Sequence, residues 1–424
     1  MFRQSCASLA IVFGLSCVKL WAADKLVLPL TLKVEAGARE RIDAAVQFVL
    51  PKENAQEPKR LWLIETTGGK ETPVAVQRDE DEHTLWWIAH GTTTVGATRT
   101  YRLEAGESAA RFPTISWQSV DGKIDAMYDS KPLLRYAQSH VVPPEGVNAK
   151  YGRSGHLHPV WTPVGAIVTD ELPPDHLHQS GIFLAFTKTE FKGHEVDFWN
   201  LAGGKGRVRY SGFGALANGP VYARLVMRHE HVDLTQADAA VGVGAKSGGE
   251  VALNETWDVR VWPAGMKSGY WLLDIRSLAS CASAEPLKLP EYHYGGMAIR
   301  GAREWKPQQV KFLTSEGDDR LKGNHTRPRW CEISGVVEGK QAGVTLMTHP
   351  GNFRYPEPLR IHPTMPYMVY TPSFLGDWEI TPRAPHVSRY RFVIHDGVLP
   401  AETIERLWKD YAEPLTAVVA ATAR

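Results

Sequence analysis

Residues 251–262, VALNETWDVRVW, alternate between apolar and polar side chains more clearly than any other run in the chain. Only Glu255 interrupts the apolar side, which otherwise consists of Val251, Leu253, Trp257, Val259 and Val261. Because successive side chains of a strand point to opposite faces, this pattern predicts a long strand with one buried face. Long alternating strands are typical of large antiparallel sheets packed face to face.

Further apolar or alternating runs predict that residues 131–411 form one large antiparallel supersandwich. These runs lie at 164–168, 181–186, 221–232, 270–278, 343–348 and 389–395. The one clear helical periodicity is at 401–412, where apolar residues recur three and four positions apart. We therefore expect an all-β domain with one C-terminal helix packed on it, followed by a tail at 412–424.

Short strand candidates also fill the N-terminal part of the chain. They lie at 26–32, 46–50, 60–65, 84–89 and 100–105, separated by polar or glycine-containing turns. Strands at this spacing predict a small immunoglobulin-like β-sandwich over residues 24–106. Residues 107–130 then form a connector to the large domain.

The first 22 residues have the pattern of a secretory signal peptide. Arg3 precedes an apolar run at 7–18, and small residues follow at 22 and 23. We predict cleavage near Ala22 and export to the periplasm or the extracellular space; a membrane-anchored N-terminus is the alternative. No later stretch is long and apolar enough to span a membrane.

The charge balance argues against a nucleic-acid-binding protein, and the cysteine content allows at most one disulfide beyond the predicted signal. The chain has 48 Lys and Arg against 47 Asp and Glu, which does not fit the basic footprint of a nucleic-acid-binding protein. Cys281 and Cys331 are the only cysteines beyond the predicted signal. In an oxidising compartment they either form one disulfide or remain as two buried free thiols.

Histidines concentrate between residues 151 and 199, where four of them form pairs spaced by two residues. In strands, His156 and His158 would share one face, and so would His176 and His178. Imidazole titrates near neutral pH, forms hydrogen bonds and binds metals. Pro159 interrupts the first pair, so we expect His156 to be solvated and His158 to be the better candidate.

The second pair follows Asp175, which suggests acid/base or hydrogen-bonding chemistry at His176 and His178. Buried structural histidines and a divalent metal site held by these two residues are the alternatives. The strand-based HxH signature of cupins adds a glutamate a few residues later. Residues 179–182 are QSGI here, so the spacing does not match the cupin signature.

Two nearby segments add further candidates. Asp197 and Trp199 suggest a carboxylate beside a stacking surface, with a turn carboxylate near core aromatics as the alternative. The segment 291–301, EYHYGGMAIRG, offers His293 and Arg300 around a glycine pair that permits close backbone approach. A glycine-rich hairpin is equally consistent with it.

Basic residues accumulate between 325 and 363. Arg329, His349 and Arg354 are the substrate-binding candidates there, and Arg327 and Arg360 add further guanidinium groups. Arginine prefers bidentate partners, so an acidic sugar or another carboxylated ligand would suit them. Surface salt bridges are the alternative.

Several of these motifs together resemble a known family. The blocks are KPLLRY at 131–136, HP at 158–159, TPVG at 162–165, PDHLH at 174–178, VDFW at 196–199 and HDG at 395–397. They are similar to a large set of exported bacterial proteins of unknown function labelled methane oxygenase PmoA. The match covers roughly 130–411. The family usually shows two adjacent histidines and a basic residue where this chain has His178-Gln179-Ser180.

This resemblance implies a galactose-mutarotase-like supersandwich rather than the polytopic membrane enzyme that shares the label. In that fold, sugars bind across a sheet face lined with His, Asp or Glu, Arg and aromatic residues. We therefore predict a secreted carbohydrate-active protein that binds a small-molecule or oligosaccharide ligand, with no resident cofactor. His176 or His178 would act as general acid/base, Asp175 or Asp197 would orient the imidazole, and the other candidates, Trp199 among them, would hold the sugar. Hydrolase, lyase and epimerase chemistry all stay open. A non-catalytic glycan-binding or structural module and a metal-dependent enzyme are the alternatives.

Overall fold

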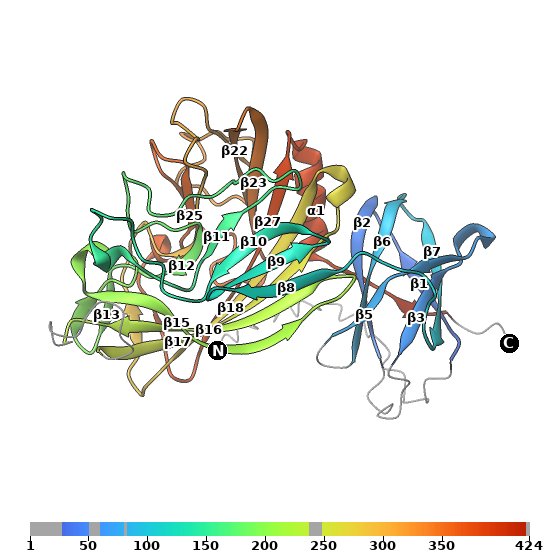
Figure 1. Cartoon of the computed structure of the whole chain (residues 1–424), viewed down its shortest axis with the longest axis horizontal. Helices are drawn as coiled ribbons and strands as arrows, with labels where there is room; N and C mark the ends of the chain where they lie inside the picture. Colours follow the sequence, from blue (N-terminus) through green and yellow to red (C-terminus); the bar gives the residue numbers. More distant parts are fainter. Residues whose placement is uncertain (1–27, 51–59, 80–82, 237–247, 421–424) are drawn as a thin grey trace, which may run out of the picture.

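The computed structural model describes residues 28–50, 60–79, 83–236 and 248–420. The predicted signal peptide lies outside the described residues. Within them the fold is all-β with one α-helix, α1 (Ala401–Ala412), as predicted. A small sandwich lies at one end of the molecule, two large sheets form most of the rest, and α1 packs beside the junction (Figure 1).

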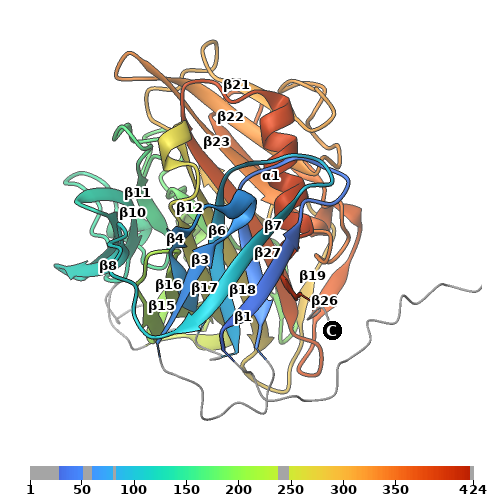
Figure 2. The ribbon, with the colours of Figure 1, turned by 90° about the vertical axis from the view of Figure 1, so that its right-hand side faces the viewer.

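The small sandwich consists of two sheets around a separate hydrophobic core. The first sheet has the order β29 (Val418–Val419), β1 (Leu30–Glu35), β7 (Thr98–Ala105), β3 (Leu61–Glu65) and β4 (Thr72–Val74). The second has the order β28 (Leu415–Thr416), β2 (Arg41–Val49), β6 (Thr84–Thr93) and β5 (Val76–Arg78). In Figure 2 this sandwich lies in front of the strands of a large sheet.

The C-terminal segment completes the small sandwich instead of forming the expected tail. Leu415 pairs with Val46 of β2 in a parallel bridge, and Val418 pairs with Lys33 of β1. Leu415 is only 6% exposed and belongs to the core of the sandwich. Leu415 and Ala417 are thus buried against strands from the other end of the described chain, whereas Val418 is 54% exposed.

Two eight-stranded sheets form the large domain. One has the order β24 (Leu359–Ile361), β25 (Tyr367–Tyr370), β20 (Gly296–Arg300), β12 (Ile182–Ala185), β11 (Leu157–Val160), β10 (Lys131–Ala137), β9 (Lys123–Tyr128) and β8 (Ile115–Val120). We call it the β20 sheet. The other has the order β15 (Gly206–Ala217), β16 (Ala223–Asp233), β17 (Glu250–Trp262), β18 (Tyr270–Cys281), β27 (His386–Asp396), β23 (Lys340–Thr348), β22 (Trp330–Val337) and β21 (Lys311–Thr314). We call it the β17 sheet.

The two large sheets share one hydrophobic core. The strand predicted at 251–262 is β17, and its predicted apolar side supplies the buried residues Leu253, Trp257, Val259 and Val261. A smaller sheet lies beside them, in the order β14 (His194–Val196), β13 (Thr189–Phe191), β19 (Leu287–Leu289) and β26 (Trp378–Ile380). A third apolar cluster joins the small sandwich, the β17 sheet and α1, and it includes Ile88, Trp262 and Leu407.

Other local predictions need correction. The expected connector at 107–130 contains β8 and β9, which form one edge of the β20 sheet. The strand expected at 164–168 is not formed: only an isolated bridge joins Trp161 to Ile167, and Val164 is 59% exposed.

Of the two states expected for the cysteines, the structure has free thiols at Cys281 and Cys331, with Cys331 buried and Cys281 partly buried. No helix in the described part of the chain is long and apolar enough to cross a membrane.

Candidate functional site

Strand register gathers aromatic and basic side chains on one face of the β20 sheet. Phe183 of β12 lies opposite Ala298 of β20, and Arg300 of β20 lies opposite Tyr367 of β25. Residues directly opposite each other, or two apart along one strand, share a face. Phe183, Arg300 and Tyr367 therefore share the face turned away from the β17 sheet, which we call the outer face.

Arg300, the last residue of β20, is only 4% exposed although it lies on this face. Its Nη2 donates to both carboxylate oxygens of Asp175, at 2.9 and 3.0 Å, and its Nη1 donates to Oε1 of Gln179 at 2.8 Å. Charge-assisted bonds of this kind are among the strongest side-chain contacts. Arg300 thus holds the loop at 170–181, which contains both predicted catalytic histidines, against the outer face.

His176 and His178 lie in this loop and not on a strand, so the strand-face prediction for the pair is wrong. Their rings are nevertheless neighbours, with centroids 5.5 Å apart, because the loop turns tightly after Pro173 and Pro174. His362, which the sequence argument did not select, lies 5.6 Å from His176 on the other side. Three imidazoles therefore lie next to one another beside Arg300.

Burial keeps two of these imidazoles neutral at pH 7. It lowers the pKa of His178 to about 4, and the nearby positive charges of Arg153 and Arg300 act in the same direction. Burial also lowers the pKa of His362 to about 4. Nδ1 of His362 accepts the N–H groups of Thr364 and Met365, so its Nε2 carries the proton and is a donor.

Aromatic rings continue the site away from the histidines. Trp199 contacts Phe183 at 4.6 Å, Tyr367 at 6.0 Å and Tyr294 at 6.4 Å between ring centroids. His293 packs on Tyr294 at 4.6 Å, and both rings are half-buried, so their free surfaces remain open to solvent.

A guanidinium group lies over an aromatic ring at each end of this set of rings. Arg153 lies 5.0 Å above the ring of Phe183 and donates to the carbonyl of His178. Arg360 lies 5.4 Å above the ring of Tyr294. The outer face thus carries a continuous set of imidazole, guanidinium and aromatic groups around Arg300.

The first histidine pair, His156 and His158, lies beside these imidazole, guanidinium and aromatic groups. His158, on β11, is hydrogen-bonded through Nδ1 to the hydroxyl of Thr169 at 3.0 Å, and burial lowers its pKa to about 4. His156 is fully buried and forms an ion pair with Glu171. The prediction that His156 is solvated is wrong, because the loop at 170–181 folds back over β11 and brings Glu171 onto it.

Four predicted site residues have other contacts. The carboxylate of Asp197 accepts the N–H groups of residues 199 and 200, as in a turn. Arg329 pairs with Glu316 and with Glu405 of α1. Arg354 donates to three backbone carbonyls in its own region. His349 lies at the junction of the two domains. The structure therefore unites His158, Asp175, His176, His178, Trp199, His293 and Arg300, and does not add Asp197, Arg329, His349 or Arg354 to them.

Among the described residues, no third side chain joins His176 and His178 as a metal ligand. In the part of the chain that the structure describes, no three His, Cys, Asp or Glu side chains are grouped so that they could hold a metal ion. His362 approaches His176 ring to ring, in an edge-on arrangement, and its Nδ1 is already used by backbone donors.

A third HxH pair, His229 and His231, was not among the predicted candidates and forms a buried polar network between the large sheets. His231 and Glu255 are hydrogen-bonded at 2.9 Å, and His229 contacts the Tyr136 hydroxyl at 2.6 Å. Burial alone would raise the pKa of Glu255, but hydrogen bonds from both histidines lower it well below its usual range. Two signals pointed here: the sequence HEH at 229–231, and Glu255 as the single polar residue on the apolar side of β17.

A family model described as a family of unknown function, DUF6807, matches residues 123–409. The chain belongs to this family. The match includes every strand of the two eight-stranded sheets except β8, and all of the residues gathered around Arg300. The resemblance to proteins labelled methane oxygenase PmoA stays a prediction.

No curated protein matches the chain. Among solved structures, the chain is similar to a protein in glycosyl hydrolase family 38 from Enterococcus faecalis, with 11% identity and a TM-score of 0.43. That match covers 93% of this chain and 48% of the other. An alpha-mannosidase from Enterococcus faecalis V583 has the same identity and TM-score, with 93% and 46% covered. The chain therefore spans about half the length of these structures.

Proposed function

We propose that this protein binds a carbohydrate on the outer face of the β20 sheet and transfers a proton to or from it through His178. The observation that carries the proposal is the arrangement around Arg300. Half-buried rings for stacking, fixed cationic donors and neutral imidazoles lie on one face within contact of one another. Sugar recognition needs both an apolar ring surface and convergent polar groups.

Each part of the site has a distinct task in this proposal. Tyr294 and His293 provide the surface on which a sugar ring stacks. His362 donates from Nε2 to a sugar oxygen. Arg300 keeps Asp175 and the histidine loop in place and does not itself need to touch the sugar.

His178 is suited to act as a base because it is neutral at pH 7, and no hydrogen bond from another described side chain occupies its ring nitrogens. Once protonated beside Arg153 and Arg300, the imidazolium would be destabilised by like charge and would return its proton readily. This cycle serves hydrolysis, elimination and epimerisation alike. Because residues 1–22 have the pattern of an export signal, we propose that the reaction takes place outside the cytoplasm.

The test is a screen of oligosaccharides for binding and turnover, followed by two substitutions. We expect His178→Gln to lower kcat by about 10²- to 10⁴-fold with little change in binding. Tyr294→Ala should instead weaken binding by about three- to tenfold, since an aromatic contact contributes about 0.5–1.5 kcal/mol. The matched control is His90→Gln, an exposed histidine of the small sandwich.

Three outcomes separate the alternatives. Turnover that survives in His178→Gln would refute the catalytic assignment. Binding that depends on Tyr294 without turnover of any sugar would indicate a glycan-binding module. Binding that neither substitution affects would place the carbohydrate site elsewhere.

A further inference from the structure

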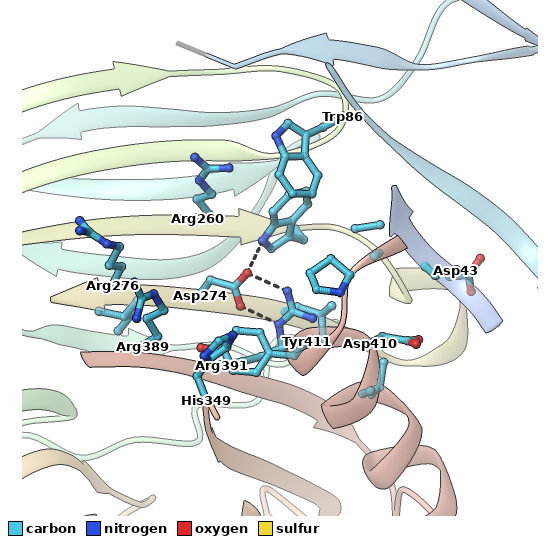
Figure 3. Close-up of a pocket in the computed structure, with 18 of the residues that line it drawn as sticks. Asp43, Trp86, Arg260, Asp274, Arg276, His349, Arg389, Arg391, Asp410 and Tyr411 are labelled. Carbon is cyan, nitrogen blue, oxygen red and sulfur yellow. Dashed lines mark hydrogen bonds and ion pairs between the residues drawn. The ribbon is translucent and has the colours of Figure 1, made fainter. Parts of the chain in front are cut away.

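A cavity of about 340 Å³ lies where the small sandwich, the β17 sheet and α1 meet (Figure 3). It shares no residue with the site around Arg300. Its volume is within the range of about 300–1,000 Å³ that is typical of small-molecule sites. Most of its exposed lining is apolar, and the large side chains include Trp86, Trp262 and Tyr411.

Charged side chains of the β17 sheet form the floor of the cavity, on the face of that sheet turned away from the β20 sheet. They lie in two rows across the strands. Across β17, β18 and β27, the register places Arg260, Asp274 and Arg391 in one row. It places Asp258, Arg276 and Arg389 in the next row. Alternating signs in the first row and two adjacent arginines in the second give the floor an excess of positive charge.

The carboxylates in these two rows, Asp274 and Asp258, already accept hydrogen bonds from other side chains. Asp274 accepts two hydrogen bonds from Arg391, at 2.6 and 2.7 Å, and one from Trp262 Nε1 at 2.9 Å. These three bonds are drawn in Figure 3. Asp258 accepts two bonds from Arg224, both at 2.8 Å.

Arg276 and Arg389 are therefore left without a carboxylate among the described residues. They lie directly opposite each other on adjacent strands. Like charges in this position destabilise a sheet, so two facing arginines without a counter-charge are unexpected for a purely structural face. A ligand that carries one negative group would relieve this repulsion and could accept from both guanidinium groups.

His349 adds a neutral donor next to them. Its Nδ1 accepts the N–H of Gly351 at 2.9 Å, so the ring proton is on Nε2. Burial and the positive charge of Arg389 lower its pKa, which keeps the ring neutral at pH 7. The ring also packs edge-on against Tyr411, at 5.1 Å between centroids. The cavity thus combines an end lined by arginine and histidine side chains with aromatic walls.

We propose that this interdomain cavity binds a monosaccharide-sized ligand that carries one carboxylate, such as a uronic acid. The carboxylate accepts from Arg276 and Arg389, and His349 donates to a neighbouring oxygen. The ring of the ligand lies between the aromatic side chains of the small sandwich and of α1, Trp86 and Tyr411. Because both domains contribute walls, the ligand also ties the small sandwich to the β17 sheet.

The test is isothermal titration calorimetry of the full chain with glucuronate, with glucose and inorganic phosphate as comparison ligands. We expect glucuronate to bind and glucose to bind at least tenfold more weakly, because glucose cannot form the charged hydrogen bonds to Arg276 and Arg389. Arg276→Gln and Arg389→Gln should each weaken glucuronate binding by about tenfold or more.

A matched control separates this site from the rest of the molecule. Arg228→Gln changes an exposed arginine on the same sheet face outside the cavity. This variant should bind glucuronate like the unmodified protein. Unchanged affinity in Arg276→Gln, an exposed position that tolerates substitution, would overturn the proposal. So would absence of glucuronate binding, equal binding of glucose, or phosphate binding as tightly as glucuronate.

Discussion

Replacement of Glu255 by leucine tests whether the buried network between the large sheets stabilises the fold. Glu255 is only 1% exposed. Its carboxylate accepts from Ser277 Oγ at 2.5 Å, from Trp257 Nε1 at 2.7 Å and from His231 Nε2 at 2.9 Å. Leucine fills a similar volume but accepts no hydrogen bond, so three buried donors lose their acceptor together.

The expected loss follows from those three donors. Each buried donor left without an acceptor costs about 1–3 kcal/mol, and removal of the buried carboxylate recovers part of that free energy. We expect Glu255→Leu to lower the free energy of unfolding by about 3–5 kcal/mol. Glu255→Gln keeps one oxygen for Ser277 and Trp257, so its loss should be about 1–2 kcal/mol.

Urea unfolding followed by tryptophan fluorescence and circular dichroism measures these differences. Glu230→Gln is the matched control, because Glu230 lies on the neighbouring strand and pairs with Arg209 in a partly exposed position. It should change the unfolding free energy by less than about 1 kcal/mol. A loss below 1 kcal/mol in Glu255→Leu would refute the argument that the network is held together by this carboxylate.

Two further predictions concern stability. Burial lowers the pKa of His158 and of His386 from 6.5 to about 4, so the unfolded chain takes up these protons first as the pH falls. Stability should therefore be complete above pH 6.5 and decline towards pH 4, by a few kcal/mol for each histidine. Urea midpoints measured across this range should fall less steeply in His158→Gln than in the unmodified protein, and parallel curves would contradict the assignment. Leu415→Ala should lower the stability of the small sandwich by about 2–4 kcal/mol, because Leu415 is part of its core. Val418→Ala, at a position 54% exposed, should change it by less than about 0.5 kcal/mol, and equal effects in thermal unfolding would count against a structural role for β28.

The strands and the single helix could be predicted because their patterns are local. Alternation over 251–262 and helical spacing over 401–412 correspond directly to β17 and α1. The residues around Arg300 were partly predictable too, since polar and aromatic residues cluster in the segments at 151–199 and 291–301. Local sequence did not show that Leu415 and Val418 belong to strands, because two-residue strands have no periodicity of their own.

The sequence by itself determined an all-β fold, one C-terminal helix and a segment rich in histidine. Tertiary structure alone decided which of those residues meet. Arg300 reaches Asp175 across 125 positions of sequence, and His362 joins His176 from a loop before β25. His349 resembles the other candidates in sequence, yet it lies in a different cavity. Periodicity fixes which face of a strand a side chain occupies, whereas strand order and loop paths, which depend on contacts between distant residues, fix its neighbours on that face.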